Sequence, residues 1–220
     1  ETDQMVEMGF LEELAQINGQ IKQGHQVLCF SATIPQHLEA FLKKMMRQPQ
    51  VIRIHQQQVA AAVTHHYYLT KQRDRLPILV QLCQLYRPYL GIVFVSKKED
   101  LPSVYSALLA GGIDTNMIHG DMNTRQRKKV LADFRAGKFN ILVASDGVAR
   151  GLDIEGITHV FSYDLPRDLN YYIHRAGRTG RAGEEGTSIV LVAADQEQML
   201  QQLLEKKKIP FTSMRLLRGE

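Results

Sequence analysis

The chain has 220 residues, 44% of them apolar and 23% charged, and its formal net charge is +4. This is the composition of an ordinary globular protein that can bury a solid core. Its apolar runs are far too short to span a membrane, and the weak basic charge by itself decides neither for nor against nucleic acid as a ligand.

The first part of the chain, residues 1–55, predicts the end of an α/β domain rather than a complete one. A strand as apolar as VLCFS, at 27–31, does not suit the edge of a sheet, yet one further strand cannot enclose it. We therefore predict that residues 1–55 are the C-terminal fragment of a first domain and that residues 56–63 are a linker. The predicted elements are a helix over 3–18, the strand over 27–31, a helix over 36–47 and a strand over 51–54.

Residues 64–220 alternate short β-branched runs with longer amphipathic ones, which predicts a second α/β domain. Several runs are continuously apolar, as strands buried on both faces of a parallel sheet are. The expected fold is a doubly wound parallel sheet with helices on both faces, whose ligands bind at the carboxyl ends of the strands. The predicted strands are 64–70, 91–95, 115–119, 140–144, 159–163 and 187–192. The predicted helices are 73–86, 97–110, 124–136, 168–178 and 195–207, with Ser96 and Glu99 as a capping box for the second and Thr124 as the cap of the third.

Both cysteines, Cys29 and Cys83, lie inside apolar runs. We therefore predict two buried free thiols, without a disulfide framework or metal-ligand spacing. This favours a reducing setting, and we expect a cytoplasmic protein. His65 and His66 are predicted to be an ordinary pair on a strand, because no further ligands are spaced to join them at a metal.

The segment 172–183, YIHRAGRTGRAG, places three permanent cations at intervals of three residues: Arg175, Arg178 and Arg181. On a helix, like charges at this spacing repel one another, and an interior glycine costs about 1 kcal/mol. Local inconsistency of this kind is expected at functional sites, and guanidinium groups bind phosphate oxygens bidentately. The segment therefore predicts a polyanionic ligand, and the alternative is a surface patch of arginines in salt bridges.

The segment 172–183 resembles motif VI of the DEAD-box RNA helicases, whose pattern is HRxGRxGR. Five further segments resemble other parts of that family in the same order along the chain. They are ETDQMVEMGF at 1–10 (motif II), SAT at 31–33 (motif III), IVFVSKK at 92–98 (motif IV), HGDMNTRQR at 119–127 (a region that reads the RNA backbone) and ASDGVARGLD at 144–153 (motif V). The resemblance covers essentially the whole chain. It implies two RecA-like domains, the first of them present from motif II onward.

The resemblance also implies a nucleotide site for ATP with Mg²⁺ in the intact two-domain protein. Arg178 and Arg181 would contact the γ-phosphate once the domains close, and Asp153 would hold the ribose, with Gly151 allowing close backbone approach. Asp153 can equally be the cap of a helix or turn. Glu1 would be the general base that positions the attacking water. The metal-binding aspartate of motif II would precede Glu1, so no metal ligand is expected within this chain.

Two further sets of residues follow from the same resemblance. The residues expected to couple the two domains are Asp3, Ser31, Thr33, His174 and Arg175, with Asp3 bonded to Ser31 or Thr33. The residues expected at the RNA are Gly120, Arg127, Ser145 and Asp146. Lys128 and Lys129 are instead interpreted as part of a solvated helix face.

As a whole, the resemblance implies an ATP-dependent RNA helicase that locally separates or remodels RNA duplexes. Its partners would be RNA, ATP and its own N-terminal RecA-like region, with no membrane. The chain contains no G-x-x-x-x-G-K-[ST] phosphate loop, so we expect it not to hydrolyse ATP by itself. Two alternatives stay open: a module that binds RNA without responding to ATP, and a DNA-acting relative with the same two-domain motor.

Overall fold

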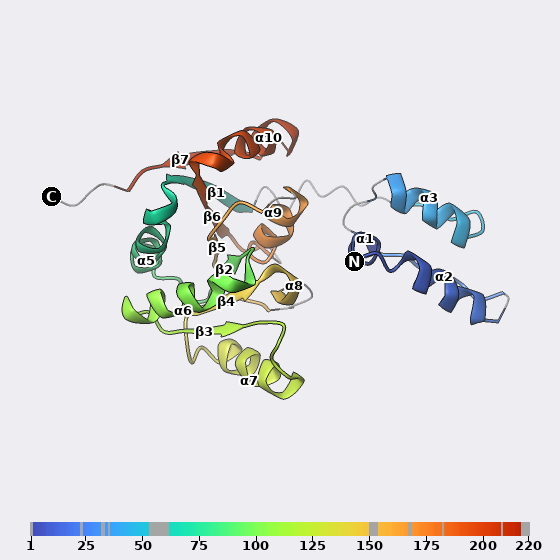
Figure 1. Cartoon of the computed structure of the whole chain (residues 1–220), viewed down its shortest axis with the longest axis horizontal. Coiled ribbons are helices and arrows are strands. Elements are labelled where there is room, and N and C mark those ends of the chain that lie inside the picture. Colours follow the sequence, from blue (N-terminus) through green and yellow to red (C-terminus); the bar gives the residue numbers. More distant parts are fainter. Residues whose placement is uncertain are drawn as a thin grey trace. The chain divides into compact units, whose positions relative to one another are not determined.

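The structure of the chain is a computed structural model that divides into two compact units, Glu1–Ile54 and His55–Glu220 (Figure 1). The residues that it describes are 2–22, 24–31, 34, 36–52, 62–149, 154–166, 169–181, 183–207 and 209–216. Each unit is considered by itself below.

The described part of the first unit consists of helices and extended segments. The helices are α1 (Thr2–Glu7), α2 (Leu11–Gln20) and α3 (Gln36–Met45). The prediction of one helix over 3–18 is wrong, because Gly9 interrupts it with a φ of +85° and a left-handed residue cannot continue a right-handed helix. α3 packs against both α1 and α2, and Leu38 on α3 is completely buried.

The strand predicted over 27–31 does not form, and residues 24–31 contain no strand. A strand requires a neighbour for its N–H and C=O groups, and the described residues of the first unit contain no other strand. Leu28 and Phe30 are therefore 66% and 73% exposed. The prediction that Cys29 is buried is wrong for the same reason, since its thiol is exposed. The strand predicted over 51–54 is absent at 51–52, and its other two residues lie outside the described residues.

The second unit is built on a seven-stranded sheet in which every pair of neighbouring strands is parallel. The order of the strands is β3-β4-β2-β5-β6-β1-β7. Their bounds are β1 Val63–Thr70, β2 Gly91–Val95, β3 Thr115–Ile118, β4 Ile141–Ser145, β5 His159–Ser162, β6 Gly186–Ala193 and β7 Phe211–Met214. Six of them were predicted to within one residue at each end. The edge strand β7 was missed, because FTSM has neither the length nor the apolar run of a central strand.

The helices of the second unit alternate with these strands. They are α5 (Arg75–Tyr86), α6 (Leu101–Ala110), α7 (Thr124–Arg135), α8 (Asp146–Ala149), α9 (Leu169–Ala176) and α10 (Glu197–Lys207). Short 3₁₀ turns at Gln72–Asp74, Lys98–Asp100 and Ala194–Gln196 precede α5, α6 and α10. The cap of α7 is Asn123, not the predicted Thr124, and its side chain forms a reciprocal capping box with Gln126.

Helices cover both faces of the sheet, so the predicted doubly wound architecture is confirmed (Figure 1). Alternate residues of β2 enter different hydrophobic clusters: Val93 and Val95 face α5 and α6, whereas Ile92 and Phe94 face α7. α9 and α10 cover the second face farther along, over β6. The buried helix residues on the first face are Leu79, Leu82, Cys83, Leu101, Val104 and Leu108, and those on the second are Val130, Phe134, Tyr172, Ala176 and Leu200.

This topology creates a crevice at the carboxyl edge of the sheet. The chain leaves β2 toward α6 on one face, whereas it leaves the neighbouring strands β4 and β5 toward α8 and α9 on the other. Where connections diverge in this way, no backbone covers the strand ends, and open α/β sheets bind their ligands there. We call this place, at the carboxyl ends of β4, β2 and β5, the switch-point crevice.

Candidate functional site

The three arginines of segment 172–183 do not share one helix. α9 ends at Ala176, so that only Arg175 is helical. Arg178 and Arg181 follow in a turn, and each donates its Nε–H to a carbonyl oxygen four residues earlier, at His174 (3.3 Å) and Gly177 (3.0 Å). The predicted helix over 168–178 is therefore too long, and the predicted cost of interior glycine does not arise. Cations here also favour the negative end of the helix dipole.

The turn after α9 is held tightly against the sheet. Gly180 has a φ of +65°, and a Cβ atom at this position would lie 2.5 Å from Cγ2 of Val63 at the start of β1. Only glycine combines that backbone conformation with so close an approach. The neighbouring Thr179 is buried and donates its hydroxyl to the carbonyl oxygen of Ile157, at 2.5 Å. The turn that carries Arg178 and Arg181 is therefore a packed part of the unit.

Arg175 is the centre of a buried polar network at the switch-point crevice. Its side chain is only 1% exposed. Nε and Nη2 donate to the two carboxylate oxygens of Asp146, each at 2.6 Å, and Nη1 donates to the carbonyl oxygen of Asp164 at 2.8 Å. Nη2 also donates to Oγ of Ser96 at 2.8 Å, and the guanidinium carbon lies 5.5 Å from the centre of the Phe94 ring. A buried cation is tolerated only when it is paired and hydrogen-bonded in this manner.

Ser96 and Asp164 complete the network, and the sequence reasoning assigned neither of them to the site. Ser96 was predicted to cap the following helix, but α6 and the 3₁₀ turn before it lack a side-chain cap bond. Its hydroxyl and its backbone N–H instead donate to the two carboxylate oxygens of Asp164, the latter at 3.1 Å. One signal for Asp164 was present in the sequence, because it directly follows the predicted apolar strand 159–163 and ligand-site residues stand at such strand ends.

The network ties together four segments that are far apart in the sequence. It joins the residues that follow β2, β4 and β5 to α9, which carries the arginine segment. Both carboxylate oxygens of Asp146 are engaged by Arg175 inside the unit. The RNA contact predicted for Asp146 and the interdomain contact predicted for Arg175 remain predictions. What the structure records for both is the positioning of the crevice and of α9.

A second buried arginine ties the neighbouring part of the same edge together. Arg75 is 5% exposed, lies with its guanidinium carbon 5.4 Å from the centre of the Tyr163 ring, and donates Nη2–H to Gln196 at 3.1 Å. Gln196 in turn donates to the carbonyl oxygen of Leu165 at 2.9 Å. Burial raises the pKa of Tyr163, so its ring stays neutral. The segments that follow β1, β5 and β6 are thereby linked.

The residues predicted at the RNA lie along the carboxyl ends of β3 and β4. β4 ends at Ser145, and Gly120 follows the adjacent β3. Arg127, in the first turn of α7, donates Nη2–H to the carbonyl oxygen of Gly120 at 2.6 Å. Next to them, Lys98 Nζ lies 2.5 Å from Asp121 Oδ2, and this ammonium holds the pKa of the Asp121 carboxyl below its usual value. Three of the predicted residues therefore share one edge, which follows from the parallel order of the strands.

In the first unit, the predicted link between residues 3 and 31 is present. The backbone N–H of Asp3 donates to Oγ of Ser31 at 3.1 Å, and the side chain of Asp3 is 3% exposed. The coupling role of the pair remains a prediction. Glu1, Thr33, Gly151 and Asp153 lie outside the residues that the structure describes. His174 lies on α9 and is partly exposed.

Two further searches of the molecule covered its described residues. Among them, none of the helices has both the length and the hydrophobicity that crossing a bilayer requires. In the same part of the chain, His, Cys, Asp and Glu side chains do not gather in threes where they could hold a metal ion. The described residues thus do not fit a Mg²⁺ site.

Comparison with known proteins identifies the family. Residues 74–183 match the family model described as "Helicase conserved C-terminal domain". The chain is 38% identical over 221 residues to the DEAD-box ATP-dependent RNA helicase CshB of Bacillus cereus, an alignment that covers 100% of this chain and 50% of that protein. It is 42% identical over 213 residues to CshB of Listeria monocytogenes, with 96% of this chain and 48% of that protein covered.

Among solved structures, S. cerevisiae Dbp5 bound to RNA and ADP BeF3 is similar with a TM-score of 0.83 and 27% identity, covering 94% of this chain and 55% of that one. The chain therefore belongs to the helicase family that the model describes, and its relatives over the whole length are DEAD-box RNA helicases. The seven-stranded parallel sheet of the second unit is the RecA-like fold of these helicases. The chain spans about half the length of the curated relatives that it matches.

Proposed function

We propose that the whole protein is an ATP-dependent RNA helicase in which two RecA-like domains close on RNA and ATP, and that this chain supplies the phosphate-binding arginines of the second domain. The observation that carries the proposal is the buried network around Arg175. It fixes α9, and with it the arginine segment, at the switch-point crevice. Similarity to DEAD-box helicases over the whole chain supports the same reaction.

Arg178 and Arg181 are the proposed catalytic groups. Phosphoryl transfer spreads negative charge over the transferred group, and a positioned guanidinium that stabilises this charge accelerates the reaction by about 10³–10⁵. Such a group must be held in place before the reaction. The tight turn at Gly180, the buried hydroxyl of Thr179 and the Nε bonds of both arginines supply that rigidity.

The RNA side of the site is the edge formed by Gly120, Arg127 and Ser145. We propose that the Gly120 backbone, the Ser145 hydroxyl and the Arg127 guanidinium contact successive phosphates of one strand. These groups lie at the ends of adjacent parallel strands, so a single backbone can pass over them. In the proposed cycle, closure of the domains bends this strand, which then no longer fits a duplex, and hydrolysis of ATP releases it. Selection of RNA over DNA would rest on the 2′-hydroxyl groups.

We also propose that the 220-residue chain does not hydrolyse ATP by itself, because its sequence contains no phosphate loop. Asp3 and Ser31 would couple the nucleotide to motif III, and His174 would link α9 to the first domain. The proposed setting is the cytoplasm. ATP would bind with Mg²⁺, whose ligands we do not assign to residues of this chain.

The test is RNA-stimulated phosphate release by the whole protein and by its Arg181→Ala variant. We expect turnover that requires RNA and falls about a thousand-fold in the variant, while RNA affinity stays within a factor of about two. The matched control is Arg87→Gly, which removes an arginine from the opposite edge of the sheet and leaves turnover unchanged. The 220-residue chain is assayed alongside and is expected to release no phosphate.

Two outcomes would refute the proposal. Turnover that survives in the Arg181→Ala variant would remove the proposed role of the arginine segment. RNA binding by the whole protein without any phosphate release would leave the module that binds RNA without responding to ATP, and its affinity would still fall with salt.

A further inference from the structure

A pocket of about 520 Å³ opens at the amino edge of the sheet, opposite the switch-point crevice. Gly112, Ile113 and Asp114 line it just before β3, and Asn140 and Ile141 line it at the start of β4. The end of α5 and the loop after it contribute the remaining residues, which are Cys83, Gln84, Arg87 and Pro88. A strand of five residues is about 16 Å long at 3.3 Å per residue, so the pocket is separated from the proposed RNA and ATP contacts by the length of the sheet.

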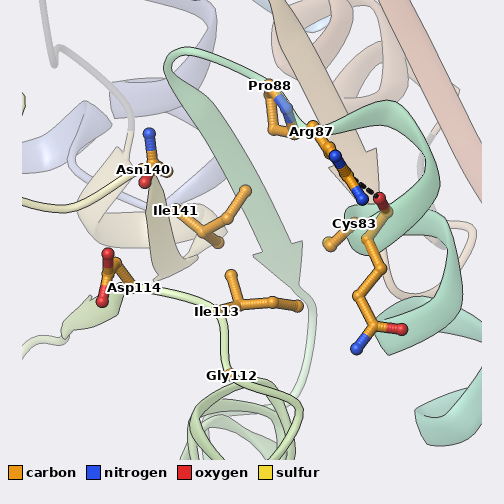
Figure 2. A pocket seen from close by; sticks show the side chains of 9 residues that line it. Cys83, Arg87, Pro88, Gly112, Ile113, Asp114, Asn140 and Ile141 are labelled. Atoms are coloured by element: carbon orange, nitrogen blue, oxygen red, sulfur yellow. Dashed lines mark hydrogen bonds between the residues drawn. The ribbon is translucent and has the colours of Figure 1, made fainter.

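The pocket has charges of opposite sign on its two sides. Figure 2 shows Arg87 on one side and Asp114 and Asn140 on the other, with Ile113 and Ile141 between them. Arg87 donates Nε–H to the carbonyl oxygen of Gln84 at 3.2 Å. Within the part of the chain that the structure describes, no side-chain partner is recorded for its two Nη groups or for the carboxylate of Asp114.

Arg87 is held where glycine is the favoured residue. It follows α5 with a φ of 43° and a ψ of 56°, in the left-handed region. Glycine ends helices in this conformation without strain, whereas a long side chain adopts it at a cost. Only Gln48 shares a positive φ with Arg87 among the described residues other than glycine. Such strain is kept at sites where the side chain has a use.

Exposed apolar side chains continue the pocket outward. Leu85 and Tyr89 are 65% and 70% exposed and are adjacent in sequence to pocket residues, and Leu109, in the last turn of α6, is 45% exposed. Tyrosine and arginine are enriched among the residues that dominate protein interfaces. RNA does not fit this chemistry, because a phosphate backbone needs a cluster of cations. The thiol of Cys83 is inert, because burial raises its pKa to about 12.

We propose that this pocket binds an extended peptide segment of a partner protein, with an acidic side chain at Arg87, an apolar side chain over Ile113 and Ile141, and a basic side chain at Asp114. The charge pattern of the pocket selects this ligand over RNA, and the apolar rim of Leu85, Tyr89 and Leu109 is larger than a small molecule would cover. The site is independent of the helicase function proposed above, because it uses none of the same residues.

The test uses the ¹⁵N-labelled 220-residue chain and a set of synthetic nonapeptides. Each peptide carries one Glu and one Lys separated by apolar residues, in both orders and at several spacings, and its control carries Gln in both places. We expect a peptide of the set to shift the amide resonances of Ile113, Asp114 and Asn140, and its Gln control to bind more weakly. Arg87→Gly and Asp114→Asn should each weaken binding by about five-fold.

Two further measurements make the test decisive. Arg87→Gly should leave the unfolding midpoint unchanged or raise it, because glycine relieves the left-handed strain. Asp114→Lys should prefer a peptide in which Glu replaces the Lys. The proposal is overturned if no peptide shifts these amides, if the shifts fall on Gly120 and Ser145 instead, or if both variants bind as the wild type does. Equal shifts of the same amides by a single-stranded RNA would also overturn it.

Discussion

His65 makes the stability of the second unit depend on pH. The imidazole is 4% exposed on β1, and Nδ1 lies 2.7 Å from the hydroxyl oxygen of Tyr172, which is itself 3.0 Å from Oγ of Ser188. Nε2 is buried without a hydrogen-bond partner among the described residues, and the Phe211 ring lies 5.4 Å away. Desolvation and the adjacent His66 lower the pKa of His65 to about 4, from 6.5.

The sign and size of the effect follow from this shift. The folded state resists the proton that the unfolded chain binds below pH 6.5, so stability is complete above pH 6.5 and is lost as the pH falls toward 4. At 1.36 kcal/mol per pKa unit, the loss between pH 8 and pH 5 is about 2 kcal/mol, and the full loss below pH 4 is about 3 kcal/mol. His66 and His159 change stability in the same direction, since burial lowers the pKa of each.

The assay is equilibrium urea unfolding at pH 8 and pH 5, followed by tyrosine fluorescence. All 8 tyrosines lie in the second unit and none in residues 1–55, so the signal reports that unit alone. We expect the wild type to lose about 2 kcal/mol more than His65→Leu over this range. Leucine cannot bind a proton, and Tyr172 keeps its bond to Ser188. Tyr172→Phe is the control, because it removes the ring's hydrogen-bond partner but leaves His65 to titrate. Parallel losses in the wild type and His65→Leu would refute the reasoning.

Three further changes test the site. Asp146→Asn should destabilise the second unit by about 2–3 kcal/mol in urea, because it leaves the buried cation of Arg175 under-neutralised, whereas Asp121→Asn, at an exposed pair, should leave the midpoint unchanged; equal effects would contradict a buried network. Gly180→Ala should cost at least about 1 kcal/mol through its positive φ alone, and a second change, Val63→Ala, should recover the steric part of the loss; full tolerance of the alanine would count against the tight turn. Ser96→Ala should speed amide hydrogen exchange in α9 while leaving α6 protected, and the reverse pattern would restore the predicted helix cap.

Much of the second unit was determined by local sequence pattern. Continuous apolar runs predicted six strands, and amphipathic runs between them predicted the helices, because both signals depend on neighbours a few residues apart. The parallel order then placed Gly120 and Ser145 at one edge, where the resemblance to DEAD-box helicases expected RNA contacts. The arginine segment was recognised from the sequence, but its helix was drawn too long, since the packing that ends α9 at Ala176 is tertiary.

Only the tertiary structure decided which polar groups meet. Ser96 lies 68 residues from Asp164 and 79 from Arg175, and its local context supported a helix cap equally well. A hydroxyl bonds to whichever partner the packing brings within about 3 Å, and sequence spacing contains no information about that distance. The same holds for residues 27–31, whose apolar pattern predicts a buried strand but cannot supply the neighbouring strand that would bury it. Short-range periodicity therefore determined the elements, whereas register and packing determined the site.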